Sequence, residues 1–497
     1  MFEVKQNHAE TTIYRKLCKF YDRIGIYILA ALFVAITIIR CRFNNLWLDE
    51  CLSVQFTKSP FGEIGGLDGC SPPLYYIYLK VFLKIFGRNT FAYHFASVVP
   101  YLIVVVLTLT VIRKEFGTRT CSLFLILASI SPSACTYNLE IRMYALASLW
   151  LLLCYMQIYF ILKTKADKNI CWMLLCIFAV EAAYTHYFAF AGVIVLYVCL
   201  LISVLWINRR KWWKFLLLAV ASIALYSPWI AVFFSRVEAV SNDFWITDIP
   251  KLKEGWNFVF GSSCKWLVML FLVGVAVSLV LGLGFIVVQK KENKVVIELN
   301  SDKKAISTLN IMIWIGFLVP VFVLIFEYAY GYLVRPVFVL RYLYPVTVLA
   351  WMSFALIFGN KRMFSGISIL IGLGMIFAYS PLYFDAYIDE KNNSKETTET
   401  VELLEAYGTN QEVIISSDIA HLSEGSLAYY FDQYQIIDNA CFDWNMGNCQ
   451  KILFLTNINL EDNEEVRKRI EEQGYSYSYE GTKTIALYSF NVYLVHR

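Results

Sequence analysis

The chain has 497 residues, of which 58% are hydrophobic, 17% are aromatic and only 16% are charged. A soluble fold does not need so much apolar surface, so the composition excludes an ordinary globular domain and predicts a helical membrane protein with several spans. The net charge of +4 is small, and its Lys and Arg residues fall in short clusters between hydrophobic runs. That distribution sets membrane orientation and gives no case for a nucleic-acid partner.

Residues 24–39 form the first unbroken apolar run, preceded by Lys16, Lys19 and Arg23. The run is long for a signal peptide and no small-residue cleavage site follows it, so we expect a retained first helix. Similar runs, each about long enough to cross a bilayer, recur along the chain. The expected membrane helices, about eleven, lie near residues 21–41, 90–112, 119–137, 141–162, 169–186, 188–207, 214–234, 265–289, 306–328, 340–359 and 364–384.

Basic clusters flank these helices at alternate ends. If the N-terminus is cytoplasmic, they all fall on the cytoplasmic side, as the positive-inside rule requires: Arg113/Lys114/Arg119, Lys163/Lys165/Lys168, Arg209/Arg210/Lys211/Lys214, Lys290/Lys291/Lys294/Lys303/Lys304 and Lys361/Arg362. This predicts a multi-pass plasma-membrane protein with a cytoplasmic N-terminus. The opposite, extracytoplasmic face then holds Asp49, Glu50, Glu140, Arg142, His186, Arg335, Arg341 and the C-terminal segment.

The first external loop, residues 44–87, contains two amphipathic stretches, 50–57 and 71–86. Ser71 suits a helix N-cap, and Pro72 suits the first helical position. We expect two short helices at the membrane interface, since Lys80 and Lys84 disfavour a span.

The composition becomes polar and charged after residue 385, which predicts two domains, a membrane domain over 1–384 and a small extracytoplasmic α/β domain over 385–497. Its expected helices cover 401–406, 425–431 and 464–472, and its expected strands cover 412–416, 451–455 and 482–495. It carries no phosphate-loop or dinucleotide motif, so we assign it no chemistry.

Asp49 and Glu50 open the external loop at the membrane edge, where a carboxylate is costly without a partner or a task. Neighbouring residues on a helix point about 100° apart, so one carboxylate can face a cavity while the other bonds elsewhere. A solvated acid pair without function is the alternative. Glu140 and Arg142 share one short loop, where an ordinary ion pair would also explain them.

Arg341 lies just inside a helix on the non-cytoplasmic side, against the inside rule. Its guanidinium is a fork of donors suited to phosphate, although a salt bridge to a loop acid would also account for it. His186, between two helices, could bind a sugar or a metal, but a structural hydrogen bond is the simpler interpretation.

The 13 cysteines are mostly scattered in apolar runs, and none has metal-site spacing. Cys51 with Cys70, and Cys441 with Cys449, would face an oxidising compartment and could form disulfides, which spacing alone leaves open.

Five segments in order, Trp47–Glu50, Asp68–Tyr76, Glu140–Leu146, Thr185–Tyr187 and Arg341–Leu343, resemble the GT-C glycosyltransferases. The closest branch is the protein O-mannosyltransferase and aminoarabinose transferase type, family 39 and its bacterial relatives. The resemblance implies transfer of a sugar from a polyprenyl-phosphate donor to an extracytoplasmic glycan, lipid or protein acceptor, by an inverting displacement with Asp49 as general base. The substrate-binding residues implied are Glu50, Asp68, Tyr75, Glu140, Arg142, Tyr144, His186, Arg341 and Tyr342.

Two positions depart from the family pattern. Many relatives have His just before the Pro-Pro pair, where this chain has Ser71, and Arg early in the second helix, where it has His94. Some relatives bind a divalent ion in this loop, so a divalent metal stays open, but we assign no metal ligands and no cofactor.

A polyprenyl-linked lipid flippase or transporter is the main alternative function. It should carry charges near the middle of its spans and an internal repeat, whereas this chain keeps its strongest charges at one face. A membrane scaffold or sensor and an oligosaccharide transferase with a diphosphate donor are further alternatives.

Overall fold

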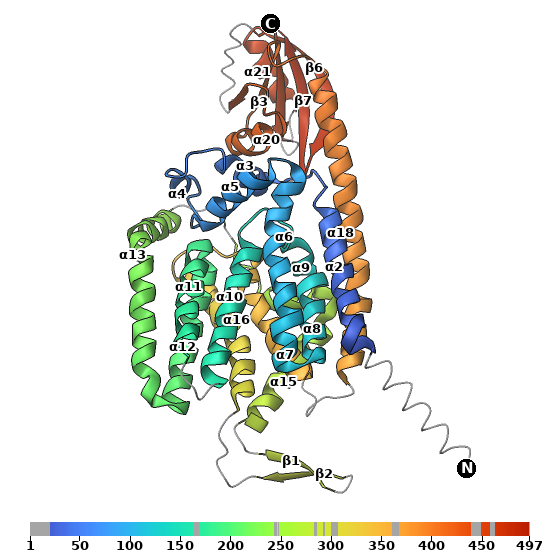
Figure 1. Cartoon of the computed structure of the whole chain (residues 1–497). Coiled ribbons are helices and arrows are strands. Elements are labelled where there is room, and N and C mark those ends of the chain that lie inside the picture. Colours follow the sequence, from blue (N-terminus) through green and yellow to red (C-terminus); the bar gives the residue numbers. More distant parts are fainter. Residues whose placement is uncertain are drawn as a thin grey trace, which may run out of the picture.

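A computed structural model describes residues 20–163, 168–242, 246, 248–282, 286–291, 294–299, 307–359, 367–438, 449–457 and 463–496. Figure 1 shows a bundle of long helices with a small sheet domain at one end. Within the described residues, nine helices are long and apolar enough to cross a membrane, and two further apolar helices are shorter. The predicted class, a multi-pass helical membrane protein with a small C-terminal α/β domain, is confirmed.

The membrane helices follow the predicted apolar runs in order. They are α2 (Ile26–Arg40), α6 (Thr90–Leu107), which continues through a π-helical turn into α7 (Arg113–Phe116), α8 (Thr118–Ile130), α10 (Tyr144–Lys163), α11 (Asn169–Thr185), α12 (Tyr187–Ile207), α13 (Trp212–Asn242), α15 (Lys265–Gly282), α16 (Thr308–Leu333), α17 (Tyr344–Gly359) and α18 (Ile367–Glu405).

Two predicted helices end well before the predicted residue. The helix expected over 119–137 is divided between α8 and α9 (Pro132–Tyr137), because Ser131 caps a new helix by accepting a hydrogen bond from the Ala134 N–H at 3.4 Å. The helix expected to reach residue 289 ends at Gly282, and Ile286–Lys291 is a strand, β1, paired antiparallel with β2 (Lys294–Leu299). Glycine and the β-branched residues that follow it favour this change.

Helix α18 is longer than predicted and crosses residue 385 without interruption. A change to polar composition does not end a helix, since apolar side chains are needed only where a helix crosses a bilayer. Figure 1 shows it running beside α2 and on to the sheet domain. The Arg40 guanidinium donates to both carboxylate oxygens of Glu390, at 2.8 and 2.5 Å, and so ties α2 to α18. Thr397 accepts a hydrogen bond from the Ala486 N–H at 2.7 Å, which fixes the sheet domain to the same helix.

The sheet domain has five strands in the order β4-β3-β5-β7-β6. They are β3 (Val413–Ser417), β4 (Ile436–Asp438), β5 (Lys451–Asn457), β6 (Ser476–Ile485) and β7 (Tyr488–His496). Strand β3 is parallel to β4 and β5, and β7 is antiparallel to β5 and β6. Helix α21 (Asn463–Glu472) packs Val466 and Ile470 against the apolar residues of β3, β5 and β7.

The first loop forms three helices between the bundle and the sheet domain: α3 (Leu48–Phe56), α4 (Ile64–Leu67) and α5 (Leu74–Phe86). The sheet domain sits directly on α3 through α20 (Ala428–Tyr430). The Tyr430 hydroxyl donates to the Leu46 carbonyl at 3.0 Å, and the Tyr429 hydroxyl donates to the Asn44 side chain at 3.2 Å. Segments that lie far from α3 in the sequence therefore fix its position.

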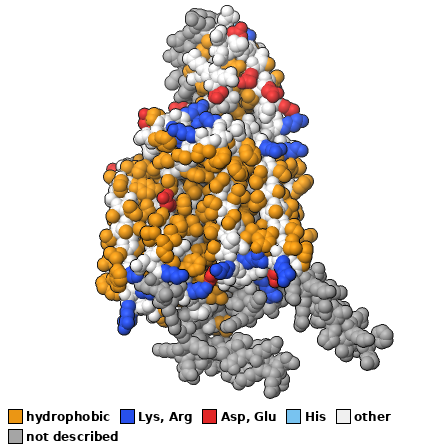
Figure 2. Space-filling view, viewed as in Figure 1, with side chains coloured by type: hydrophobic (Ala, Val, Ile, Leu, Met, Phe, Trp, Pro, Cys, Tyr) orange, Lys and Arg blue, Asp and Glu red, His pale blue; other side chains and the backbone are white. Residues whose placement is uncertain are grey.

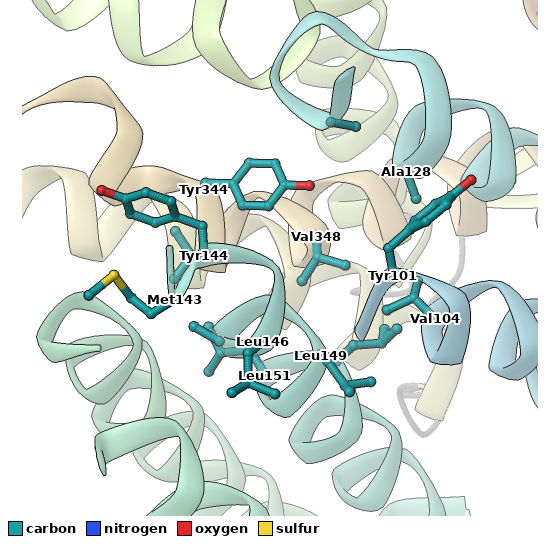
Figure 3. Close-up of a cluster of buried hydrophobic side chains, with 14 of the residues drawn as sticks. Tyr101, Val104, Ala128, Met143, Tyr144, Leu146, Leu149, Leu151, Tyr344 and Val348 are labelled. Carbon is teal, nitrogen blue, oxygen red and sulfur yellow. The ribbon is translucent and has the colours of Figure 1, made fainter. Parts of the chain in front are cut away.

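The bundle core is packed from helices that are distant in sequence. Figure 3 shows Tyr101 of α6, Ala128 of α8, Leu149 of α10 and Val348 of α17 side by side. Helix α17 is buried along its whole length, as expected for a central helix in a bundle. On the face that Figure 2 shows, the bundle carries a broad apolar band bordered at both ends by charged side chains.

Candidate active site

Helix α3 turns its two adjacent carboxylates to different tasks. Glu50 is buried, and its oxygens accept hydrogen bonds from the Trp47 N–H at 3.2 Å and the Ile141 N–H at 2.9 Å. It therefore closes the first turn of α3 and holds the loop before α10 against it. Asp49 points elsewhere, with its side chain 22% exposed.

Asp49 meets two arginines from other parts of the chain. Its Oδ2 lies 3.4 Å from Nη2 of Arg341 and 4.0 Å from Nη2 of Arg142. Arg341 stands on a short helical turn, Leu340–Leu343, before α17, and Arg142 on the loop before α10. The structure thus brings together the acid and the two cations that the sequence singled out, separated by 292 residues in the case of Arg341.

Asp68 and Tyr76 complete the cluster on the side of Arg142. The Arg142 guanidinium lies 3.8 Å from Asp68 and donates to the Tyr76 hydroxyl at 2.9 Å, while that hydroxyl donates to Asp68. Burial raises the pKa of the Asp68 carboxyl, but the Arg142 charge and the bonds from Tyr76 and the Cys70 N–H outweigh it, so the net pKa falls below its usual value. Asp68 is therefore an anion that holds Arg142 in place.

An aromatic wall lies beside Arg341. Its guanidinium carbon is 5.0 Å from the centre of the Trp47 ring. Tyr342 stacks on Phe188 with ring centres 5.0 Å apart and meets His186 edge-on at 5.6 Å. Burial, with the Arg142 and Arg341 charges, lowers the pKa of His186 to about 3, and its Nδ1 accepts from the Phe188 N–H at 3.2 Å. His186 is therefore a neutral, hydrogen-bonded wall residue.

Glu140 lies close to Glu50 and shares its environment. Burial, reinforced by the Glu50 charge, raises the pKa of Glu140 to about 8. Burial likewise raises the pKa of Glu50 to about 8, against the lowering effect of its two backbone hydrogen bonds. Oε1 of Glu140 is buried and has no hydrogen-bond partner among the described residues.

Some of the predicted residues lie outside this cluster. Tyr75 is fully buried and its hydroxyl pairs with Ser97 at 2.8 Å, so Tyr76, which the sequence did not favour, occupies the site instead. Tyr144 packs its ring against His186 at 5.6 Å and is also fully buried. Arg335 donates to the Asn242 carbonyl at 2.5 Å.

Cys51 and Cys70 are both free, so the disulfide that their spacing left open is not formed. The Cys51 thiol is buried and donates to the Leu46 carbonyl at 3.4 Å, while Cys70 is exposed. Cys449 is also free, and Cys441 lies outside the described residues.

Among the described residues, no group of three or more His, Cys, Asp or Glu side chains is placed to hold a metal ion. In the loop, Asp68 is engaged by Arg142 and Tyr76, and Ser71 offers only a hydroxyl. These residues do not fit a divalent metal site.

A groove of about 220 Å³ begins at the aromatic wall and runs between α12, α13 and α16. His186, Tyr342 and Arg236 line its polar end, and the rest is lined by apolar residues such as Ile194 and Phe326 and by the buried residue Glu327. Arg236, which sequence reasoning missed, donates to the carbonyls of Ser71 and Gly65 at 2.5 and 2.6 Å and lies over Trp229. The sequence signal that could have identified Arg236 is the same as for Arg341: a basic residue on the predicted extracytoplasmic side.

A second apolar cavity of about 440 Å³ lies between α11, α12 and α13. It shares Phe190, Ile194 and Phe233 with the groove, so the two cavities are neighbours along the same helices. A third cavity, of about 500 Å³, lies on the other side of Arg341 and is more polar than the other two.

No protein-family model matches the sequence, and no curated protein matches it. The fold is similar to the crystal structure of ArnT from Cupriavidus metallidurans bound to undecaprenyl phosphate, with a TM-score of 0.56 and 12% identity over 95% of this chain and 98% of that one. ArnT from the same organism in the apo state aligns over the same shares at 11% identity, with a TM-score of 0.46. The resemblance to the GT-C class, in its aminoarabinose transferase branch, is thus confirmed for the fold.

Proposed function

We propose that this protein is a membrane glycosyltransferase that moves a sugar from a polyprenyl-phosphate carrier to an acceptor outside the cytoplasm. The observation that carries the proposal is the pairing of Asp49 with Arg341, whose chain neighbour Tyr342 lines the polar end of an apolar groove. A lipid-linked sugar needs this combination, since its tail stays in the membrane while its phosphate and sugar must reach polar groups. The solved ArnT structure bound to undecaprenyl phosphate supports the same class of carrier.

The groove and the neighbouring apolar cavity fit the lipid tail. Their walls are almost entirely apolar and lie on membrane helices α11, α12, α13 and α16. The phosphate would lie at the polar end, where Arg236 and the neighbouring Arg341 supply guanidinium donors. His186, being neutral, adds no charge there.

Asp49 is the proposed general base. It would take the proton of an acceptor hydroxyl as the oxygen attacks the anomeric carbon and the bond from that carbon to the phosphate oxygen breaks. The electron pair of that bond leaves with the phosphate, which becomes a monoester with one more negative charge. Arg341 and Arg142, both within 4.0 Å of Asp49, would stabilise this charge more in the transition state than in the ground state.

The test is transfer of radiolabelled sugar by Asp49→Asn, which keeps the size of the side chain and removes the base. We expect transfer to fall by about 10²- to 10⁴-fold while the carrier lipid still copurifies. Asp385→Asn, at an exposed position of α18, is the matched control and should retain full transfer. Transfer at the normal rate by Asp49→Asn would remove Asp49 as the base.

We infer that the sheet domain and the site face outward and that the carrier is a monophosphate. The positive-inside pattern supports the orientation. Phosphatase fused after Arg497 should be active only outside the cytoplasm, and activity inside would refute the orientation. Mass spectrometry of the copurified lipid separates a monophosphate from a diphosphate. Lipid movement across vesicles without sugar transfer would instead favour the flippase alternative.

A further inference from the structure

The polar cavity on the far side of Arg341 is not part of the groove. It lies between the end of α2, the α9 end of the bundle, α18 and the sheet domain, and has a volume of about 500 Å³, within the range of small-ligand sites, about 300–1,000 Å³. Asp389 of α18 and Thr136 of α9 are exposed, which opens the cavity to solvent. Arg341 lines this cavity, and its neighbour Tyr342 lines the groove. The wall between the two cavities therefore includes Arg341, which pairs with Asp49.

The charges of this cavity disfavour an anion. Four carboxyl groups line it, those of Glu50, Glu140, Asp389 and Glu390. Its two guanidinium groups already face carboxylates, since Arg40 is paired with Glu390 and Arg341 with Asp49. Glu50 and Glu140, whose pKa burial raises to about 8, are mostly protonated at neutral pH, but an entering phosphate or carboxylate group would still have to displace an existing ion pair.

The other lining groups suit hydroxyls. The amides of Asn45 and Asn393 offer donors and acceptors, and the rings of Trp47 and Tyr137 offer flat apolar faces. Oε1 of Glu140 is buried, lines the cavity and has no hydrogen-bond partner among the described residues. A buried oxygen without a partner is destabilising, and a hydroxyl donor on a ligand would offset that cost.

We propose that this cavity binds the acceptor and that the acceptor is an uncharged, polyhydroxylated glycan. The inference rests on the proposed transferase function, and it adds the acceptor class and its binding site. One hydroxyl of such a glycan would reach past Arg341 to Asp49, while the ring beside it lies on Trp47 and bonds to the amides and to Glu140.

The experiment uses the full-length protein in lipid nanodiscs with its labelled carrier lipid. Three acceptor probes are compared: a neutral hexasaccharide mixture drawn from common glucans, mannans and galactans, the same mixture carrying phosphate groups, and a Ser/Thr peptide. Asn393→Trp fills the cavity from α18, and Asn392→Trp, at the exposed neighbouring position, is the matched control. Retained carrier lipid and melting temperature are measured for each variant.

We expect label on the neutral hexasaccharides. Asn393→Trp should raise their KM about tenfold or more while retaining carrier lipid and melting temperature, and Asn392→Trp should change none of these. Transfer only to the phosphorylated or peptide probe, retained carrier without transfer to any neutral probe, or equal effects of the two Trp variants would overturn the inference. If the unmodified protein neither binds the carrier lipid nor transfers sugar, the transferase proposal itself is refuted.

Discussion

Glu50 and Glu140 should make the protein less stable as the pH rises above neutral. Burial raises the pKa of both carboxyls to about 8, against an ordinary value of about 4.5. The folded state therefore holds protons that the unfolded state has already lost. The contribution of these two carboxyls to the free energy of unfolding is complete below pH 4.5. It falls as the pH rises toward 8, by up to about 1.4 kcal/mol per pH unit for each carboxyl.

His186 changes stability with pH in the opposite direction, so it sets the lower limit of the pH range for the measurement. Its folded-state pKa, lowered to about 3, makes stability rise with pH until the unfolded histidine loses its proton near pH 6.5. Asp68, whose pKa is lowered, contributes its full stability throughout this range. Between pH 6.5 and 8 the two glutamates therefore dominate, and the slope should be negative.

The assay is thermal unfolding in detergent followed with a thiol-reactive dye, because buried cysteines such as Cys51 and Cys264 react only after unfolding. The melting temperature should fall from pH 6.5 to 8, and Glu140→Gln, which cannot ionise, should lose about half of that slope. A melting temperature that is flat or rising over this window, or an unchanged slope in Glu140→Gln, would refute the reasoning.

Three further predictions concern single side chains. Tyr76→Phe should cost about 1–3 kcal/mol and lower transfer, because it removes the hydroxyl that bonds Arg142, whereas Tyr75→Phe should leave transfer per folded molecule unchanged. Glu327→Leu should raise the melting temperature, since neither carboxyl oxygen has a hydrogen-bond partner among the described residues; a lower value would contradict this. Gly425→Leu should reduce transfer, as any side chain there meets Leu48 of α3, and unchanged transfer would disprove that contact.

The membrane architecture could be predicted from sequence because hydrocarbon imposes a length and a composition on each span. All eleven predicted apolar runs contain a helix in the described residues, nine of them long enough to cross a membrane and two shorter. The errors concern where individual helices end. The second half of α18, residues 385–405, is polar, so hydropathy could not show that the helix continues. The strand β1 after Gly282 was missed because an apolar β-branched run is the same signal in a strand and in a span.

The residues of the candidate site also divide into those that the sequence could identify and those that it could not. Asp49, Arg142 and Arg341 could be selected from sequence because a charge at a membrane boundary is costly and needs a reason. The choice between Tyr75 and Tyr76 could not be made, since adjacent helical residues point about 100° apart and only the packing of α5 on its neighbours fixes the rotation. Arg236 was overlooked because its partners, the carbonyls of Ser71 and Gly65, lie about 165 and 171 residues away.

The sequence alone determined that the chain is a helical membrane protein and which ionisable residues stand at one end of its bundle, because transfer free energies act on each segment separately. Tertiary structure alone decided that Asp49 and Arg341 lie 3.4 Å apart and that Glu50 bonds to the backbone while Asp49 pairs with arginines. It also decided that two cavities of different polarity are lined by the neighbouring residues Arg341 and Tyr342. These depend on packing between segments up to several hundred residues apart, which no local pattern encodes.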